Sequence, residues 1–309
     1  MTQPEQRVAE ASALRRFFQE QWDTLQHLLH EQHQRQLGRQ RQDQAVAGAV
    51  ESIVTGTDGR LRLASHYKQA LRRSARALLG YVEELAAALP PALPVSRRRL
   101  TTDPLLRRLI RSREQIEQLF RRNPQVQQFF ADPKHSQCAE VFGLLSLLRY
   151  EKTVLGSEMR GDMILREVRQ TAVNFTARQL TLPRPSEEEA RKAVRQLMFD
   201  SAVGHVKRQI LFQRESLSQE QKRQARLHPE QSLNNPEVYL HLLTGLLANP
   251  QRLLQMKREQ LCLNSMDIRL AESQASHHDR LLFHELGIGD ERARVISLVR
   301  YPRAEFDQG

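Results

Sequence analysis

Thr171-Ala-Val-Asn-Phe-Thr-Ala-Arg-Gln-Leu-Thr-Leu182 is the stretch that separates this chain from an all-helical protein, because it is rich in β-branched and alternating residues. This pattern predicts a β-strand. The expected partner strand is Lys152–Met159, which would form an antiparallel hairpin across Arg160-Gly161-Asp162. Leu144–Arg166 is also compatible with a helix, so the spacing of its apolar residues leaves two structures open.

A second hairpin is expected at the C-terminus. Leu281–Leu286 and Ala293–Arg300 are both rich in strand-forming residues, and they flank the turn sequence Gly287-Ile-Gly-Asp-Glu-Arg292. Asp267–Leu270 is a candidate edge strand beside them. A further turn is predicted at Gly56-Thr-Asp-Gly59, between the two short extended pieces Val50–Thr55 and Arg60–Ala64.

Helical spacing dominates the N-terminal part of the chain. Apolar residues recur at this spacing from about residue 8, and the predicted helix continues into a Gln- and Arg-rich stretch at 34–44. Such a polar extension is typical of a solvated helix end or a connector. The alternative is a projecting helix that binds a partner or associates with a second copy. A second helix is expected over Ser65–Leu89, because Pro90-Pro-Ala-Leu-Pro94 must end it.

Helix starts recur through the rest of the chain. Ser186 and Glu189 form a capping box that predicts a helix from Glu187 to about Arg214. An N-cap residue precedes a first-turn proline at five places. These are Asp103-Pro104, Asn123-Pro124, Asp132-Pro133, Asn235-Pro236 and Asn249-Pro250. We therefore expect a mostly α (α+β) protein, a multi-helix body with short antiparallel β-hairpins in the middle and at the C-terminus.

The Pro90–Pro94 stretch also predicts the domain organisation. It would separate an N-terminal helical region, residues 1–90, from an α-rich main domain, residues 91–309, that ends in the β-hairpin. A single domain of 309 residues is the alternative.

Composition excludes several classes of protein. The longest uncharged run, residues 238–251, is 14 residues long, whereas a transmembrane helix needs about 20 apolar residues. The N-terminus lacks the apolar run of a signal peptide. Two cysteines, Cys138 and Cys262, are too few for a cysteine-rich zinc site and are expected to be free thiols rather than one disulfide. These observations predict a cytoplasmic protein.

Charge is distributed unevenly along the chain. The net charge is +11, yet residues 60–122 alone contain 15 cations and 5 acids. Lys68, Arg72 and Arg76 share one helix face, and a patch fit for phosphates would form if the following helices pack beside them. Arg113, Arg121 and Arg122 extend the segment. The predicted anion-binding residues are Lys68, Arg72, Arg73, Arg76, Arg97, Arg98, Arg99, Arg107, Arg108 and Arg111.

This basic segment predicts a non-enzymatic binding or scaffold protein whose Arg-rich surface, residues 60–122, binds nucleic acid or another polyanion, or docks on an acidic protein. A basic face that only keeps the protein soluble is the alternative. Few aromatic residues lie in the segment, so stacking of single-stranded bases has little support. Of the 47 cations 40 are Arg, which suits anion recognition but equally follows from a GC-rich genome.

An enzyme of unknown reaction, with its site near the central or the C-terminal hairpin, is the rival hypothesis. No nucleophile elbow and no Gly-rich phosphate loop is present. The His and acidic residues at the C-terminal hairpin fit no established metal-site spacing, so we expect no metal and no cofactor. The candidate residues are Glu151, Glu158, Asp162 and Glu167 in the middle, and His277, His278, Asp279, His284 and Glu285 near the end.

Overall fold

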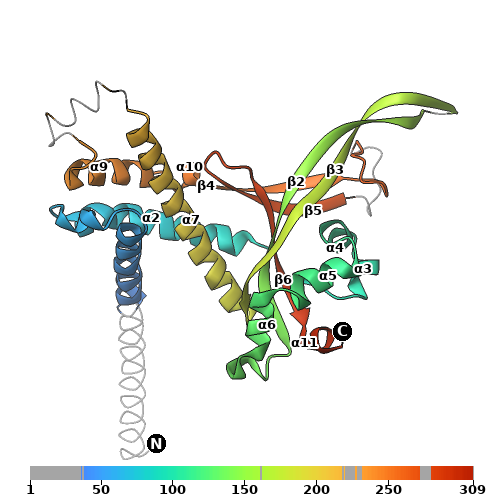
Figure 1. Ribbon diagram of the computed structural model, residues 1–309, viewed down its shortest axis with the longest axis horizontal. Coiled ribbons are helices and arrows are strands. Elements are labelled where there is room, and N and C mark those ends of the chain that lie inside the picture. The colour runs from blue at the N-terminus through green and yellow to red at the C-terminus, as the bar shows by residue number, and fades with distance from the viewer. Residues whose placement is uncertain are drawn as a thin grey trace, which may run out of the picture.

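The centre of the protein is an antiparallel sheet that curls into a half-barrel, seen in the computed structural model (Figure 1). The structure describes residues 36, 38–160, 162–217, 219, 227, 232–271 and 280–308, without the side chains of 158–160. The strand order is β3-β2-β6-β5-β4, and β1 pairs in parallel with β6. The strands are β1 (Leu93–Pro94), β2 (Glu140–Arg160), β3 (Met163–Arg184), β4 (Leu254–Cys262), β5 (Arg280–Ile288) and β6 (Arg294–Pro302).

Helices surround this sheet. A helix over residues 38–56 precedes α2 (Tyr67–Ala88), and the remaining helices are α3 (Arg99–Thr102), α4 (Pro104–Leu109), α5 (Arg113–Ile116), α6 (Pro124–Ala131), α7 (Glu187–Glu215), α9 (Pro236–Leu247), α10 (Pro250–Leu253) and α11 (Arg303–Asp307). Three single-turn elements, η1 (Gly59–Leu63), η2 (Glu117–Arg121) and η3 (Pro133–His135), lie between them. We call residues 99–131, from α3 to α6, the helical lobe.

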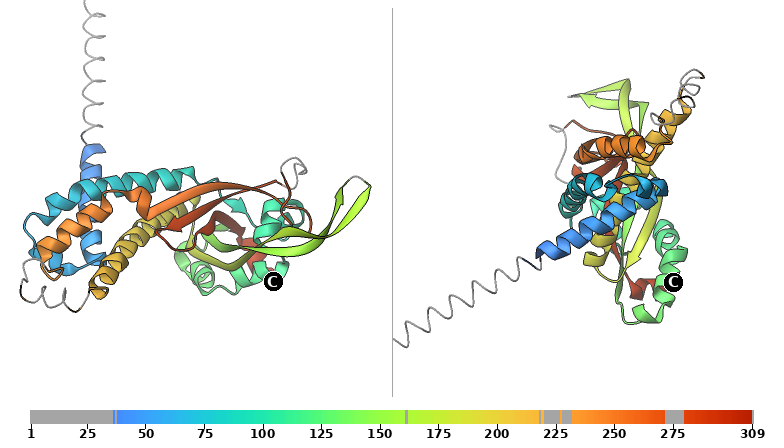
Figure 2. Two further views of the ribbon diagram at one scale, coloured as in Figure 1. Left: turned by 90° about the horizontal axis from the view of Figure 1, so that it is seen from above. Right: turned by 90° about the vertical axis from the view of Figure 1, so that its left-hand side faces the viewer.

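The expectation of a mostly α protein with short hairpins is wrong. The described chain is 52% helical and 29% strand, a mixed α+β protein. β2 and β3 pair as one hairpin along almost their whole length, from Phe142 opposite Arg184 to Arg160 opposite Met163. Its far half projects beyond the body in Figures 1 and 2, where Leu155 and Ile164 are exposed.

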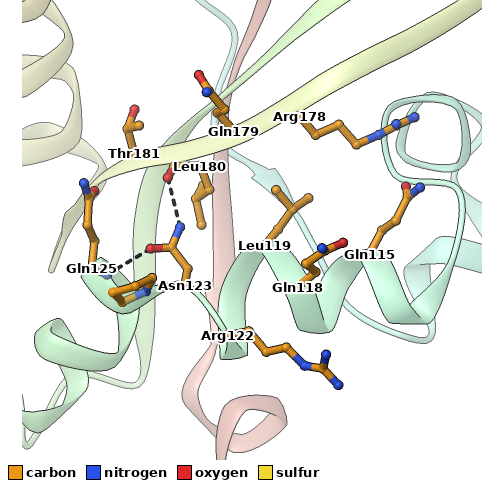
Figure 3. Close-up of a pocket in the computed structure, with 11 residues that line it drawn as sticks. Gln115, Gln118, Leu119, Arg122, Asn123, Gln125, Arg178, Gln179, Leu180 and Thr181 are labelled. Atoms are coloured by element: carbon orange, nitrogen blue, oxygen red, sulfur yellow. Dashed lines mark hydrogen bonds between the residues drawn. The ribbon is translucent and has the colours of Figure 1, made fainter.

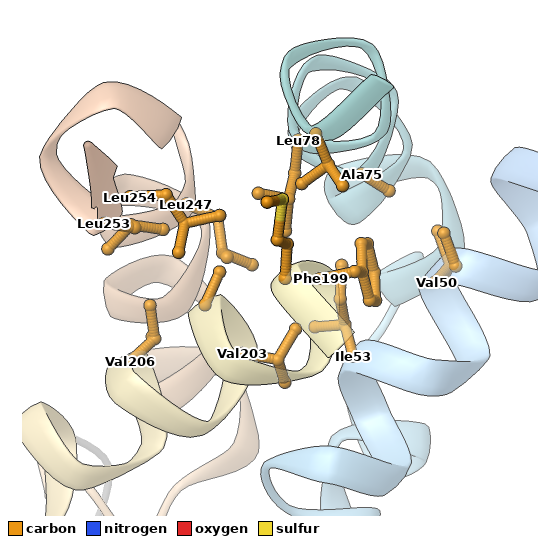
Figure 4. Packing of buried hydrophobic residues seen from close by; sticks show 14 of the residues in the cluster. Val50, Ile53, Ala75, Leu78, Phe199, Val203, Val206, Leu247, Leu253 and Leu254 are labelled. Atoms are coloured by element: carbon orange, nitrogen blue, oxygen red, sulfur yellow. The ribbon is translucent and has the colours of Figure 1, made fainter. Parts of the chain in front are cut away.

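Two apolar clusters explain why the sequence pattern predicts shorter strands than the structure has. The first cluster joins the helix over residues 38–56 with α2, α7, α9 and α10 (Figure 4). The second cluster joins the helical lobe to the sheet. In β2, Leu144 belongs to the first cluster and Leu145 to the second; in β6, Leu298 and Val299 divide in the same way. Strands buried on both faces have continuous apolar runs, which resemble a buried helix in the sequence.

The segment between β4 and β5 joins the two edge strands of the curled sheet. The Val173 amide donates to the Asp267 carbonyl at 2.9 Å, and the Arg269 amide donates to the Thr171 carbonyl at 2.8 Å. The Leu270 amide donates to the carbonyl of Cys262, at the end of β4. The predicted edge strand Asp267–Leu270 is therefore a short bridge from β4 to β3 rather than a strand beside the C-terminal hairpin.

Several local predictions are confirmed. The helix expected over Ser65–Leu89 is α2, and Ser186 caps α7 by accepting a hydrogen bond from the Glu189 amide. Four of the five residues that precede a first-turn proline cap the following element through the side chain, although the element after Asp132 is only the turn η3. Asn249 precedes α10 but forms no side-chain cap hydrogen bond in the described structure. Both cysteines are free. The predicted N-terminal helix up to residue 35 lies outside the described residues.

The two extended pieces predicted at Val50–Thr55 and Arg60–Ala64 are wrong, although the chain does bend at residue 57 between them. Val50 and Ile53 lie in the helix over residues 38–56, and Arg60 lies in η1, which Asp58 caps. The two apolar side chains are buried in the first cluster, so tertiary packing overrides their preference for strands. The C-terminal hairpin is confirmed, but its ladder covers only His284–Leu286 because β6 then continues along β2.

No helix in the described part of the chain is both long enough and apolar enough to cross a membrane. The domain boundary expected near residue 90 stays a prediction.

Gly289, in the turn between β5 and β6, provides a test of the packing between this turn and α7. Its φ is +52°, and a Cβ at this position would overlap the imidazole of His205. Gly289→Ala should therefore lower the free energy of unfolding by about 1–3 kcal/mol. Chemical denaturation measures the change. Gly287→Ala is the matched control, because its Cβ would meet neighbours only at 3.8 Å or more; an equal decrease in both variants would contradict the packing described.

Candidate anion-binding site

The predicted cations on α2 lie beside acidic residues of the preceding helix. Arg72 Nη2 is 2.6 Å from Asp43 Oδ1, and Arg76 Nη2 is 3.4 Å from the same oxygen. Lys68 Nζ is 3.8 Å from Glu51 Oε1. Most of the positive charge on this helix face is therefore balanced within the fold. Arg73, on the same helix, has no ion-pair partner among the described residues.

Arg108 and Arg111 bind an internal anion. Arg108 forms an ion pair with Asp267, and Arg111 Nη2 lies 2.6 Å from Asp267 Oδ2. Arg108 also donates to the Asn264 carbonyl at 2.7 Å, and Arg111 donates to the Asn174 side chain at 2.7 Å. Both side chains thus hold the segment that bridges β4 and β3 against the end of α4. Their contribution to an external anion is limited by this carboxylate.

A third group keeps its charge exposed. Arg98, Arg99 and Arg107 have no acidic partner within 4 Å in the described part of the chain, and all three are exposed. Arg107 donates to the Thr101 carbonyl at 3.3 Å, while the Thr101 hydroxyl donates to the Arg98 carbonyl at 2.7 Å. These bonds draw the Arg107 side chain to the turn of α3. Arg97, by contrast, lies 3.6 Å from Glu117.

The ten predicted residues form two separate groups. α2 packs against α7 and α9, whereas α3 and α4 lie at the far side of the sheet (Figures 1 and 2). The helices that carry the two groups do not pack side by side. The four residues of α2 and the six of the 97–111 segment therefore do not share one face.

A pocket of about 760 Å³ lies between the helical lobe and β3 (Figure 3). On the side of the lobe, η2 and the start of α6 line it. Two of its lining residues, Arg122 and Arg178, are cations, and none of those in the described part of the chain is acidic. The lining residues are Gln115, Gln118, Leu119, Arg122, Asn123, Pro124, Gln125, Arg178, Gln179, Leu180 and Thr181.

Arg178 is not among the anion-binding residues predicted from the sequence, because it lies on β3, outside the basic segment. The one signal in the sequence is that it is the only charged residue in Thr171–Leu182. Its Nε donates to the Leu109 carbonyl at 2.6 Å, which holds the guanidinium beside the end of α4. Its Nη2 is buried and has no hydrogen-bond partner among the described residues. Burial, and to a lesser degree the nearby Arg111 charge, lowers the pKa of Arg178.

The residues of the enzyme hypothesis are brought together only in part. Arg149 Nε lies 2.8 Å from Glu285 Oε1, and Arg149 Nη1 lies 3.2 Å from Glu151 Oε1, so the two predicted groups share one guanidinium. Asp162 and Glu167 are exposed on the projecting hairpin. His277, His278, Asp279 and the side chain of Glu158 lie outside the described residues.

Burial distinguishes the two neighbours His284 and Glu285. Glu285 is buried on the side of the second cluster, and this burial raises its pKa despite the Arg149 guanidinium. His284 points to the other side of the strand, where partial burial lowers its pKa. Among the described residues, no group of three or more His, Cys, Asp or Glu side chains could hold a metal ion.

No family model, curated protein or solved structure matches this chain. The function must therefore be inferred from the geometry, which offers three exposed arginines without acidic partners among the described residues and a pocket in the same lobe that Arg122 and Arg178 help to line.

Glu285 predicts a specific pH dependence of stability. Its folded pKa lies above the unfolded value of about 4.3, so its contribution to stability is largest at low pH and falls as the pH rises through the folded pKa. Glu285→Gln removes this decrease. The free energy of unfolding of the variant, relative to wild type, should increase from pH 4 to pH 7, as measured by urea denaturation.

Glu51→Gln is the control of opposite sign. The Tyr67 hydroxyl, 3.0 Å from Glu51 Oε1, lowers the pKa of that carboxyl, with burial opposing and the nearby cations assisting. Glu51 therefore contributes stability that is lost as the pH falls through its folded pKa. The deficit of Glu51→Gln should shrink on acidification. Parallel pH profiles for the two variants would contradict the electrostatic assignment of Glu285.

Proposed function

We propose that the protein is a non-enzymatic binding protein that uses the exposed arginines at the start of α3 and on α4 to bind a polyanion, with the nucleic-acid backbone as the partner class. The observation that carries this proposal is the group Arg98, Arg99 and Arg107, which has no acidic partner in the described chain. Guanidinium groups form paired hydrogen bonds with phosphate oxygens, so exposed arginines suit such a ligand.

The mode of binding follows from the kind of contact. Contacts to phosphates carry no base information, and they release counterions, so affinity should be steeply salt-dependent and almost independent of sequence. The α2 group should contribute less, because Asp43 and Glu51 already neutralise part of its charge.

Two finer proposals concern the setting of the protein. A cytoplasmic location is supported by the free thiols of Cys138 and Cys262, since reducing compartments keep thiols unpaired. Self-association through the N-terminal helix is a further proposal; most of that helix lies outside the described residues.

Removing the three exposed cations should weaken binding selectively. We expect Arg98→Gln, Arg99→Gln and Arg107→Gln, combined in one variant, to lower the affinity for labelled duplex DNA and to flatten its salt dependence. The slope of log K against log salt should fall by about 0.9 for each phosphate that the variant no longer neutralises. Fluorescence anisotropy across a salt series measures both quantities.

The matched control combines Lys68→Gln, Arg72→Gln and Arg76→Gln, which removes the same charge from α2. It should retain most of the affinity and the salt slope. An equal reduction in both variants would show that only overall charge matters, as for a basic face that keeps the protein soluble. Tighter binding of polyglutamate than of DNA at equal ionic strength would overturn the polyanion proposal in favour of an acidic protein partner.

A further inference from the structure

Internal hydrogen bonds engage the side-chain carbonyl oxygens of two glutamines that line the pocket beside the helical lobe. Gln115 Oε1 accepts from the Arg111 amide at 2.9 Å, and Gln179 Oε1 accepts from Arg294 at 3.4 Å. Neither side-chain amide nitrogen has a hydrogen-bond acceptor among the described residues, so both can donate to a ligand. Asn123 is engaged at both ends of its side-chain amide, because its Oδ1 accepts from the Gln125 amide and its Nδ2 donates to the Leu180 carbonyl (Figure 3).

Two cations add positive charge to the pocket wall. Arg122 is exposed, and Arg178 is held in place through its single bond to the Leu109 carbonyl. A buried guanidinium nitrogen without a partner is costly, and a nearby anion would reduce the electrostatic part of that cost. No lining side chain is acidic, so an anion would meet no repulsion from the walls.

We propose that this pocket binds a phosphoryl group carried by a small molecule. A phosphoryl group presents three acceptor oxygens and up to two negative charges, which match the side-chain N–H groups of Gln115 and Gln179 and the positive charges of Arg122 and Arg178. Leu119, Pro124 and Leu180 add apolar wall against which an organic part of the ligand packs. The volume of about 760 Å³ lies in the usual range for small-molecule sites.

This inference goes beyond the proposed function, because the pocket residues differ from Arg98, Arg99 and Arg107. The two sites can therefore fail separately. Absence of DNA binding with intact phosphate binding would remove only the proposed function, and the reverse result would remove only the pocket.

Calorimetric titration of the full chain with pyrophosphate and ADP, at fixed ionic strength, tests the pocket. Arg122→Gln and Arg178→Gln should each weaken binding about tenfold or more, as expected when a charge-assisted hydrogen bond is removed. Arg107→Gln is the matched control and should bind both compounds like wild type. Since Arg122 is exposed, its variant keeps the test valid even if Arg178→Gln fails to fold.

Competitors separate the sources of the anion. Citrate supplies carboxylates without phosphorus, and a 5′-phosphorylated oligonucleotide supplies the same group on a nucleic acid. Wild-type affinity for pyrophosphate and ADP in both pocket variants would overturn the proposal. Stronger binding of citrate, or Arg178-dependent binding of the oligonucleotide with no binding of pyrophosphate or ADP, would overturn it as well.

Discussion

The arrangement of the sheet and the helical lobe depends on the ion pairs that the Asp267 carboxylate forms with two arginines. The carboxylate forms ion pairs with Arg108, near the end of α4, and with Arg111, which follows α4. The backbone carbonyl of Asp267 accepts a hydrogen bond from the Val173 amide of β3. The same short segment continues to β4. One residue therefore ties together both edges of the curled sheet and the helical lobe, and its φ of +63° shows how tightly the chain turns there.

Ion pairs of this kind divide the arginines and lysines of the chain into neutralised and exposed ones. Cations that lie beside Asp43, Glu51, Glu117 or Asp267 are partly neutralised inside the fold. Arg98, Arg99 and Arg107 have no acidic partner in the described chain and lie at the start of α3 and on α4. The geometry of the sheet creates the pocket, because Arg178 on β3 faces the lobe that Asp267 holds in place. Cations that pair within the fold and cations that stay exposed thus lie next to each other, and sequence position alone does not separate them.

Local signals in the sequence predict helix ends well, as Ser186 and the Asx-Pro starts show, because a cap depends on neighbouring residues. The length of β2 is harder to predict, since Leu144 and Leu145 face different clusters and produce no alternation. Local backbone irregularities near Glu167, Ala177 and Leu182, each with positive φ, break the pattern further in β3. Arg178 is held beside the helical lobe only through its tertiary contact with the Leu109 carbonyl, which composition does not reveal; composition points to residues 60–122 instead.

Hydrogen exchange on the Asp267→Asn variant tests most directly whether Asp267 holds the sheet and the helical lobe together. Asparagine tolerates the same φ, but it removes the charge that holds Arg108 and Arg111. The amides of Val173, Arg269 and Leu270 should exchange faster, while the amides of β6 paired with β2 keep their protection. Unchanged exchange at these three amides would contradict the central place given to Asp267.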